Sequence, residues 1–471
     1  MKKIQIAIIG NYPPRQCGIA TFTKHLTQGI LNDSGGKQNM DVDAYIVAMN
    51  DKEYHYPEEV RYTIRQGHQK DYLMAAKFIN HSNADVCILE HEFGIFGGDD
   101  GAYILSLANR LEIPLITTLH TVLKEPSYCQ KIITRELAQR AKNTVVMSNL
   151  AVDFLTAAYD IPLEKIMMIE HGVPDFSLTE RDISKDRFQF TGRKVLMTFG
   201  LISRNKGIET VIEALPEVVE RHPDVLYVIL GKTHPNVVEA SGEEYRVYLK
   251  RLVDRYHLGN NVEFLDMFVS EERLKEYLAA TDIYITPNLN EAQITSGTLA
   301  YAVGAGAGVV STPYWHAKEL LGGGRGIIFD FQDSRMLARI LNDLLDNHSK
   351  LNELRNRAYN HGRKMIWPAI GARYKDLAIE LAKSGQVAPK RAQYIVDAQM
   401  LPGFDLTYMI SLSDDTGIIQ HAKYSVPNLK EGYCLDDNAR ALIMASMAYR
   451  QNKDRLTLSL IPKFMSFMHY M

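Results

Sequence analysis

Cysteine is scarce in this sequence, and long apolar runs are missing. The four cysteines lie far apart and form no CxxC pair, which indicates neither a zinc site nor a disulfide framework. The N-terminal apolar run, residues 4–9, is too short for a signal peptide's apolar region or a membrane span. Reduced thiols without an export signal predict a cytoplasmic protein with no transmembrane segment.

Neither sign of charge dominates. Lysine and arginine number 53 against 56 aspartates and glutamates, which leaves a formal charge of -3. A nearly neutral protein has no overall field that attracts nucleic acid or an anionic membrane, so neither is expected as a partner. Any anion that the chain binds must be held by local groups. The length of 471 residues predicts two or three domains.

Short runs rich in β-branched and apolar residues occur in two series. The first series is 4–9, 43–49, 85–89, 114–118 and 144–147. The second series, which follows a polar stretch at 176–192, is 194–199, 225–230, 262–265, 283–286 and 308–311. Segments long enough for helical crossovers separate the runs, which favours parallel sheets with helices on both faces. We therefore predict an α/β fold of two Rossmann-like domains in tandem.

This organisation predicts where the domains begin and end. The expected segments are a first domain at 1–185, a second domain at 186–365, a helix crossing back to the first domain at 366–385, and a helical extension at 390–471. The extension is expected to be the beginning of a larger helical domain, because two helices bury little core alone. A linker is expected at 385–390. In the second domain, a helix over 208–219 should bend or break at Pro216.

The strongest local signal for chemistry is the segment 198–207, which lies between an apolar strand and an amphipathic helix. Its glycines allow a tight turn, and Lys206 stands just before the helix start, where free backbone N–H groups can help to bind a phosphate. The alternative is an ordinary turn with solvated cations. A second segment, 291–298, also follows a strand. There Thr295 or Ser296 can cap a helix whose N-terminus favours an anion, although an ordinary capped helix remains open.

Other nucleotide and metal signatures fail on inspection. No strand is followed by GxGxxG, which argues against an NAD-dependent oxidoreductase. The glycine-rich segment 304–308 lacks the final glycine of that motif and is expected to end a helix. Gly231-Lys232-Thr233 has Leu226 where a P-loop requires its first glycine. Asp41-Val42-Asp43 matches a metal-binding DxD but opens a strand with no ligand partner nearby. No metal and no cofactor are therefore expected.

In the first half, several polar or small residues follow predicted strands. Gly18 lies in the loop after the first strand, His120 follows the run 114–118, and His91 and Glu92 begin a loop rich in glycine and aromatic residues. Ligands of open parallel sheets bind at the carboxyl ends of strands, so these residues are candidates to face a cleft between the domains. A satisfied polar histidine and a structural loop are the alternatives.

Together these motifs resemble the family 4 retaining glycosyltransferases, which have the GT-B architecture of two facing Rossmann-like domains. The resemblance covers residues 1 to about 385 and includes the first loop, His120, Glu170-His171-Gly172-Val173 and the segment 200–207. It implies a donor diphosphate held by the second domain, a carbohydrate acceptor on the first, and transfer of a hexose from a UDP- or GDP-sugar without an obligatory metal.

The resemblance assigns roles position by position. Lys206, Glu291 and His120 are expected to be catalytic, and His91 and Glu92 to lie on the acceptor side. The expected donor-binding residues are Gly18, Arg204, Thr295, Ser296, Gly297, Thr298 and Glu319. Two departures stand out: Leu201 occupies the position of the family's arginine, and Leu299 that of its second glutamate, eight residues after Glu291. Arg204 and Glu319 are the candidates to replace them.

The tail and the departures leave other readings open. Asp414 to Gly417 and Tyr433 to Ala441 are similar to the beginning of helical toroid domains fused to some of these transferases. The missing glutamate and displaced arginine are also compatible with a catalytically weak nucleotide-sugar-binding or scaffold protein. A phosphorylase of the same architecture is a further alternative.

Overall fold

The computed structural model describes residues 3–32, 40–177, 181–384, 405–424 and 426–471. The chain divides into two compact units, Met1–Arg391 and Ala392–Met471. The linker predicted at 385–390 lies outside the described residues. Among the helices that are described, none is both long and apolar enough to cross a membrane.

The first domain is built on a parallel sheet of seven strands in the order β3-β2-β1-β4-β5-β6-β7. Its strands are β1 (Ile4–Gly10), β2 (Val42–Asn50), β3 (Val60–Arg65), β4 (Val86–His91), β5 (Leu115–Leu119), β6 (Asn143–Val146) and β7 (Ile166–Met168). The five strands predicted from apolar runs are confirmed. The edge strands β3 and β7 were not predicted, because β3 is largely exposed and β7 is only three residues long.

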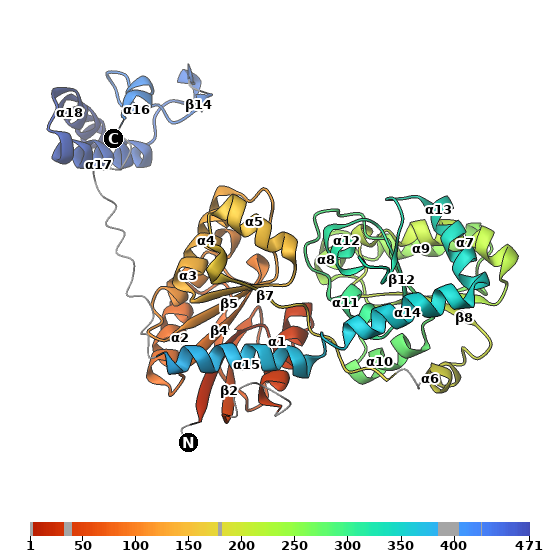
Figure 1. The fold of residues 1–471 in the computed structure, drawn as a ribbon. Coiled ribbons are helices and arrows are strands. Elements are labelled where there is room, and N and C mark those ends of the chain that lie inside the picture. The colour runs from red at the N-terminus through yellow and green to blue at the C-terminus, as the bar shows by residue number, and fades with distance from the viewer. Residues whose placement is uncertain (1–2, 33–39, 178–180, 385–404, 425) are drawn as a thin grey trace. The chain divides into compact units, whose positions relative to one another are not determined.

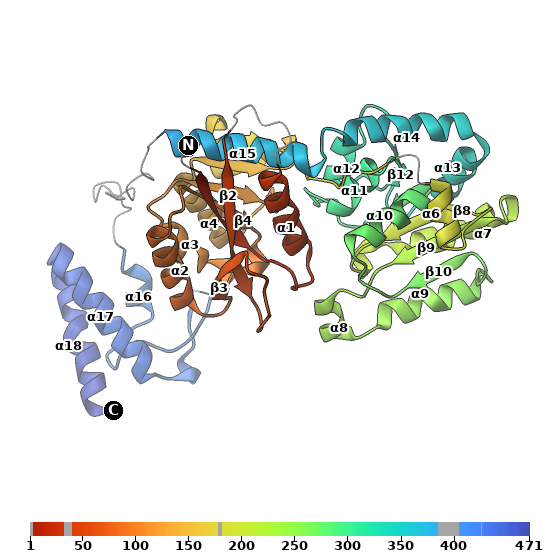
Figure 2. The same ribbon diagram turned by 90° about the horizontal axis from the view of Figure 1, so that it is seen from below.

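Helices cover both faces of this sheet (Figure 2). They are α1 (Gly18–Leu31), α2 (Gln69–His81), α3 (Ile104–Ala108), α4 (Tyr128–Arg140) and α5 (Asn149–Tyr159), joined by α15 (Trp367–Lys383) from the far end of the unit. Helix α15 lies along α1 (Figure 1). Buried side chains of α1 and α15 form one core with β1, whereas α2, α3 and α4 pack on the opposite face.

The second domain contains a parallel sheet in the order β10-β9-β8-β11-β12-β13. Its strands are β8 (Lys194–Phe199), β9 (Val225–Leu230), β10 (Val262–Leu265), β11 (Ile283–Thr286), β12 (Gly308–Ser311) and β13 (Ile327–Ile328). Its helices are α6 (Arg181–Arg187), α7 (Ile208–Arg221), α8 (Pro235–Ser241), α9 (Glu244–Arg255), α10 (Glu271–Ala280), α11 (Gly297–Gly304), α12 (Trp315–Leu320), α13 (Ser334–Asp346) and α14 (His348–Gly362). The predicted α/β class with two parallel sheets is confirmed.

Helix α7 runs through Pro216 without interruption, so the expected break does not occur. Proline removes one backbone hydrogen bond from a helix. Here the apolar face of α7, with Val211, Leu215 and Val218 fully buried, packs into the core of the second domain. We attribute the continuity of the helix to this packing.

In both sheets the strand order reverses direction at one point. In the first sheet β1 lies between β2 and β4, and in the second sheet β8 lies between β9 and β11. At such points the loops that follow neighbouring strands diverge to opposite faces, which opens a crevice at the carboxyl edge where ligands bind. The loops concerned are those after β1 and β4 and those after β8 and β11. These loops carry most of the residues singled out in the sequence.

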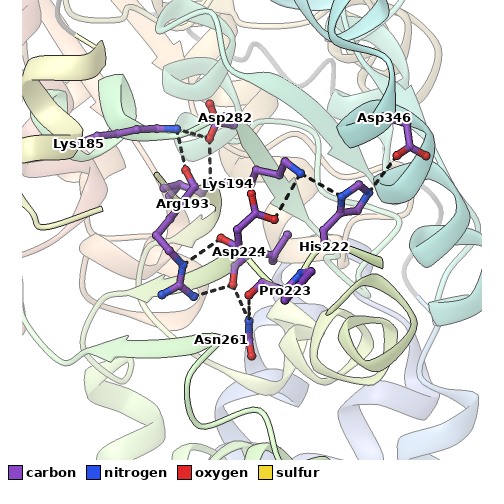
Figure 3. Close-up of polar contacts among 11 residues, drawn as sticks. Lys185, Arg193, Lys194, His222, Pro223, Asp224, Asn261, Asp282 and Asp346 are labelled. Carbon is purple, nitrogen blue, oxygen red and sulfur yellow. Dashed lines mark hydrogen bonds and ion pairs between the residues drawn. The ribbon is translucent and has the colours of Figure 1, made fainter. Parts of the chain in front are cut away.

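A polar network ties together the amino ends of β8, β9, β10 and β11, at the opposite edge of the second sheet (Figure 3). Arg193 donates from Nε to the carbonyl of Asp224 at 2.9 Å and from Nη2 to the carbonyls of Val225 and Asn260, both at 2.8 Å. Asp282 accepts from Lys185 Nζ at 2.6 Å and from the backbone of Val195 at 2.8 Å. This edge therefore holds the strand ends in register by charge-assisted hydrogen bonds.

The second unit is mainly helical over its described residues. It contains α16 (Thr407–Ser411), β14 (Ala422–Lys423), β15 (Val426–Pro427), α17 (Leu435–Asn452) and α18 (Arg455–Tyr470). Helices α17 and α18 pack against each other through Ala441, Ala445, Leu460 and Phe464. The prediction of a mostly helical C-terminal extension is confirmed.

Candidate active site

Lys206 lies at the end of the loop that follows β8, on the short 3-10 turn Arg204–Lys206. The loop starts at Gly200, whose φ of +129° is a conformation that residues with a side chain rarely adopt. A Cβ atom at Gly200 would lie 3.2 Å from Cγ2 of Thr298 and 3.8 Å from Nζ of Lys206. The loop after β8 and the first turn of α11 therefore converge on the same small volume.

The ammonium group of Lys206 has no protein partner among the residues that the structure describes. Its side chain is half-buried, and burial lowers its pKa from 10.5 to about 8. Among the described residues no carboxylate or other acceptor contacts Nζ. A cation held in this way, without an internal partner, gains most from a ligand that brings negative charge. Lys206 thus makes the carboxyl edge of the second sheet the candidate anion site.

The first turn of α11 faces the same volume with backbone N–H groups. Ser296 caps the helix by accepting from the backbone of Leu299 at 3.4 Å, and its own N–H donates to Nδ1 of His316 at 2.9 Å. Burial lowers the pKa of His316 to about 4, so this ring stays neutral and keeps its acceptor. The N–H groups of Gly297 and Thr298 have no partner among the described residues, and together with the dipole of α11 they favour an anion here.

His171, in the segment that leaves the first domain, also contacts this turn. Its Nδ1 lies 2.7 Å from the carbonyl of Gly172, and burial lowers its pKa to about 3. The ring is therefore neutral, donates from Nδ1 and has an acceptor at Nε2. A Cβ atom at Gly297 would lie only 2.9 Å from that Nε2, so glycine at this position lets the helix start approach the histidine. His171 belongs to a motif noted in the sequence, but it was not predicted to be a site residue.

On the first domain, His120 follows β5 and pairs with a buried carboxylate that sequence reasoning missed. Its Nε2 lies 2.8 Å from Oε2 of Glu90, which is fully buried at the end of β4. Thr118 donates to the other carboxylate oxygen of Glu90 at 3.3 Å. The signal was present in the sequence, since Glu90 is a charged residue directly after the apolar run Cys87-Ile88-Leu89. The pair fixes the orientation of the imidazole ring.

The other first-domain candidates differ in accessibility. Gly18 begins α1 and has open space around it, because no atom lies within 4 Å of a Cβ built there. His91 is fully buried beside Phe93 and Phe96, with neither ring nitrogen hydrogen-bonded, and burial lowers its pKa to about 3. Glu92 accepts from the backbone of Phe93 at 3.1 Å and from the hydroxyl of Thr121 at 2.5 Å. Contact of His91 or Glu92 with an acceptor remains a prediction.

Three of the predicted second-domain residues are engaged with protein groups. Arg204 contacts Glu244 at 2.8 Å and lies over the rings of Tyr245 and Tyr248. Glu291 forms an ion pair with Lys318 at 3.0 Å and is more than half exposed. Glu319 accepts hydrogen bonds from the first residues of α5 in the first domain. Their roles toward a donor remain predictions.

The second domain is similar to a known protein family. Residues 180–365 match the family model described as glycosyl transferases group 1. We call this matched segment the glycosyltransferase domain. Its boundaries enclose the loop after β8, the loop 291–298 and α12, and therefore Lys206 and the first turn of α11, but not His171.

A curated relative extends the likeness beyond this glycosyltransferase domain. The D-inositol 3-phosphate glycosyltransferase of Corynebacterium diphtheriae is 27% identical over 285 residues. The match includes 56% of this chain and 65% of that protein, so the chain spans a little less than two thirds of the relative's length.

Solved structures show that the two domains together have the GT-B fold. A sucrose-phosphate synthase from Thermosynechococcus elongatus superposes with a TM-score of 0.63 at 16% identity, over 81% of this chain and 100% of that chain. Anabaena HepE in complex with UDP and glucose has a TM-score of 0.59 at 15% identity, again over 81% and 100% of the two chains. At these identities the likeness concerns the fold alone.

Proposed function

We propose that this protein is a retaining glycosyltransferase that moves a hexose from a UDP- or GDP-sugar to a carbohydrate acceptor without a metal ion. The observation that carries the proposal is the anion site of the glycosyltransferase domain, where Lys206 has no partner among the described residues beside the free N–H groups of Gly297 and Thr298. A nucleoside diphosphate matches it in charge. The HepE protein was solved with UDP and glucose, which makes UDP-glucose the first donor to test.

The proposed chemistry uses fixed positive charge on the leaving group. As the bond between the anomeric carbon and the diphosphate breaks, negative charge grows on the diphosphate oxygens. Lys206 and the start of α11 are aimed at that charge, so they stabilise the transition state more than the bound donor. The acceptor hydroxyl then attacks from the face that the diphosphate leaves, and its proton passes to a diphosphate oxygen. No covalent intermediate on the protein is required.

The first domain supplies the opposite wall. His120, oriented by Glu90, is proposed to contact the transferred sugar, and Gly18 leaves room for the donor or acceptor at the first loop. Glu291 is proposed to contact the donor sugar, which requires its exposed ion pair with Lys318 to open. Such surface pairs contribute ~0–1 kcal/mol, so this rearrangement costs little.

The test is transfer from a panel of UDP-, GDP- and ADP-sugars to acceptors that include D-inositol 3-phosphate, which the relative's name suggests. We expect one donor to release its nucleotide only when an acceptor is present, with unchanged rate in EDTA. Proton NMR of the first product should show the donor's anomeric configuration. An inverted product, or a rate abolished by EDTA and restored by a divalent ion, would contradict the mechanism.

A catalytically weak nucleotide-sugar-binding protein is the second candidate. Leu299, at the position of the family's second glutamate, is fully buried in the apolar core, and Arg204 is engaged with Glu244. Both observations remove groups expected to contact a donor. Binding of UDP-sugars with no transfer across the acceptor panel would favour this candidate. Phosphate-dependent cleavage of an oligosaccharide would instead indicate a phosphorylase.

A further inference from the structure

Glu319 makes an unusual contact between the two domains of the first unit. It lies on α12 of the glycosyltransferase domain, yet its carboxylate accepts hydrogen bonds from the start of α5 in the first domain. Oε1 accepts from the backbone N–H and from Nδ2 of Asn149, both at 2.7 Å, and Oε2 accepts from the backbone of Leu150 at 3.3 Å. In Figure 1 the two helices face each other.

The carboxylate completes the cap of a helix in the other domain. The first N–H groups of a helix have no partner within the helix. In α5, the hydroxyl of Ser148 accepts from the backbone N–H of Ala151 at 3.2 Å. The carboxylate of Glu319 accepts from the N–H groups of the two preceding residues, Asn149 and Leu150. A negative charge at this position also interacts favourably with the helix dipole. Separation of the domains would expose these groups to water and lose the charge-assisted contact.

Apolar contacts reinforce the same junction. Phe154 of α5 and Trp315 of α12 meet edge to face, with ring centroids 5.0 Å apart. Ile294 lies in the loop 291–298, here called the donor loop, and is buried in a first-domain cluster that includes Leu119 and Val122. These two residues lie on either side of the segment that carries His120. The junction therefore brings the loop 291–298 against the His120 segment.

Backbone hydrogen bonds connect helix α12 to the donor loop. The backbone N–H of Trp315 donates to the carbonyl of Glu291 at 3.0 Å, and that of His316 donates to Gln293 at 3.1 Å. His316 in turn accepts from Ser296, the cap of α11. These hydrogen bonds connect α12 to the start of α11, where the candidate anion site lies.

We infer that Glu319 is a positioning residue: its carboxylate, bound to the start of α5, holds the two domains closed and sets the donor loop against His120. The inference rests on the proposed function for its kinetic consequence only. Contact of Glu319 with a donor would require these bonds to break, so closure and a direct donor contact by this side chain exclude each other. The closed fraction of the protein should therefore depend on the charge of residue 319.

The test changes charge on both sides of the junction in the full-length protein. Glu319→Lys places a cation at the positive end of α5, and Asn149→Asp places a second carboxylate beside Glu319. The double variant Asn149→Asp/Glu319→Lys restores opposite charges. Glu353→Gln is the matched control, because Glu353 pairs with Arg357 within α14, away from the junction.

Closure is measured without any ligand, from spin-label distances between the domains. Labels are attached at Met74→Cys on α2 and Met336→Cys on α13, which are both exposed, after the three partly exposed cysteines have been replaced by serine. We expect each single variant to add a population at a changed distance, and the double variant to recover the wild-type distribution. In turnover, the KM for the donor should rise about tenfold in Glu319→Lys and return to within about threefold in the double variant.

Two results would overturn the inference. One is an unchanged distance distribution in both single variants, and the other is a double variant whose effects are the sum of the single ones. Loss of folding in Glu319→Lys leaves Asn149→Asp to decide, because an added carboxylate in the first turn suits α5 itself. If the distances shift as expected but UDP neither binds nor is released, the positioning role stands and the proposed function fails.

Discussion

The unpartnered ammonium of Lys206 permits a test in which activity and stability move in opposite directions. Lys206→Met keeps most of the side chain's length and removes its charge. Burial lowers the pKa from 10.5 to about 8. At 1.36 kcal/mol per pKa unit, the charged form is less favourable in the free protein by an amount on the order of 3 kcal/mol. Methionine removes this cost and leaves no hydrogen-bonding group without its partner.

The free energy of unfolding should therefore be unchanged or higher in Lys206→Met, whereas turnover should fall. A charge-assisted contact is worth ~1.5–3 kcal/mol. If Lys206 contacts the leaving diphosphate, kcat/KM should decrease by about 10- to 100-fold, and UDP should bind more weakly by calorimetry. Initial rates of nucleotide release and thermal unfolding are measured on the same preparations. Lys350→Met, at an exposed lysine on α14, serves as the control.

Wild-type kcat/KM in a folded Lys206→Met protein would refute the assignment of Lys206 to the diphosphate. A large loss of stability would refute the premise that the ammonium has no protein partner, because removing a lysine that stabilised the fold would leave its partner unpaired.

Three further predictions concern the glycosyltransferase domain. Only the charged form of Lys206 attracts a diphosphate, so UDP affinity should be constant well below pH 8 and should fall as the pH rises through about 8. The affinity is measured by calorimetry between pH 6 and 9.5, and an affinity that does not fall above pH 8 would show that the lysine is not involved. Arg193→Met should lower the free energy of unfolding by about 2–3 kcal/mol, because three carbonyls lose a charged donor. The kcat should stay within about twofold of wild type. A urea unfolding midpoint equal to that of wild type would contradict the stabilising role of the amino edge. Leu299→Glu should destabilise the domain by at least ~3 kcal/mol without raising activity, because it places a carboxylate in a fully buried apolar site. A folded variant with faster turnover would show that a glutamate at this position can contact the donor.

The fold was largely predictable because parallel strands buried on both faces leave long apolar runs. The run at 225–230 is strand β9 residue for residue, with every side chain buried. The edge strand β3 escaped notice for the converse reason: Arg61 and Arg65 face solvent, so the run has no continuous apolar character. A bend or a break was predicted at Pro216. The break does not occur, because the packing of Val211 and Leu215 outweighs the local propensity of proline.

The candidate site was predictable where chemistry and backbone pattern coincide in a short segment, as at Lys206 and Ser296. Contacts between distant segments left no such trace. Nothing local in the sequence indicates that His171 approaches Gly297, or that Glu319 reaches Asn149 across 170 positions. Such pairs depend on how two domains meet, and a single sequence contains no pattern for that arrangement.

The polar network at the amino edge of the second sheet has a consequence for how this domain can evolve. Arg193 and Asp282 secure the strand ends through backbone groups, so their contribution to folding does not depend on the sequence of the loops at the other edge. Under the proposed function, substitutions that adapt those loops to a new sugar or base would depend on stability supplied by the amino edge. A lineage that changes its donor should therefore vary around 200–207 and 291–298, while the residues in Figure 3 stay as they are.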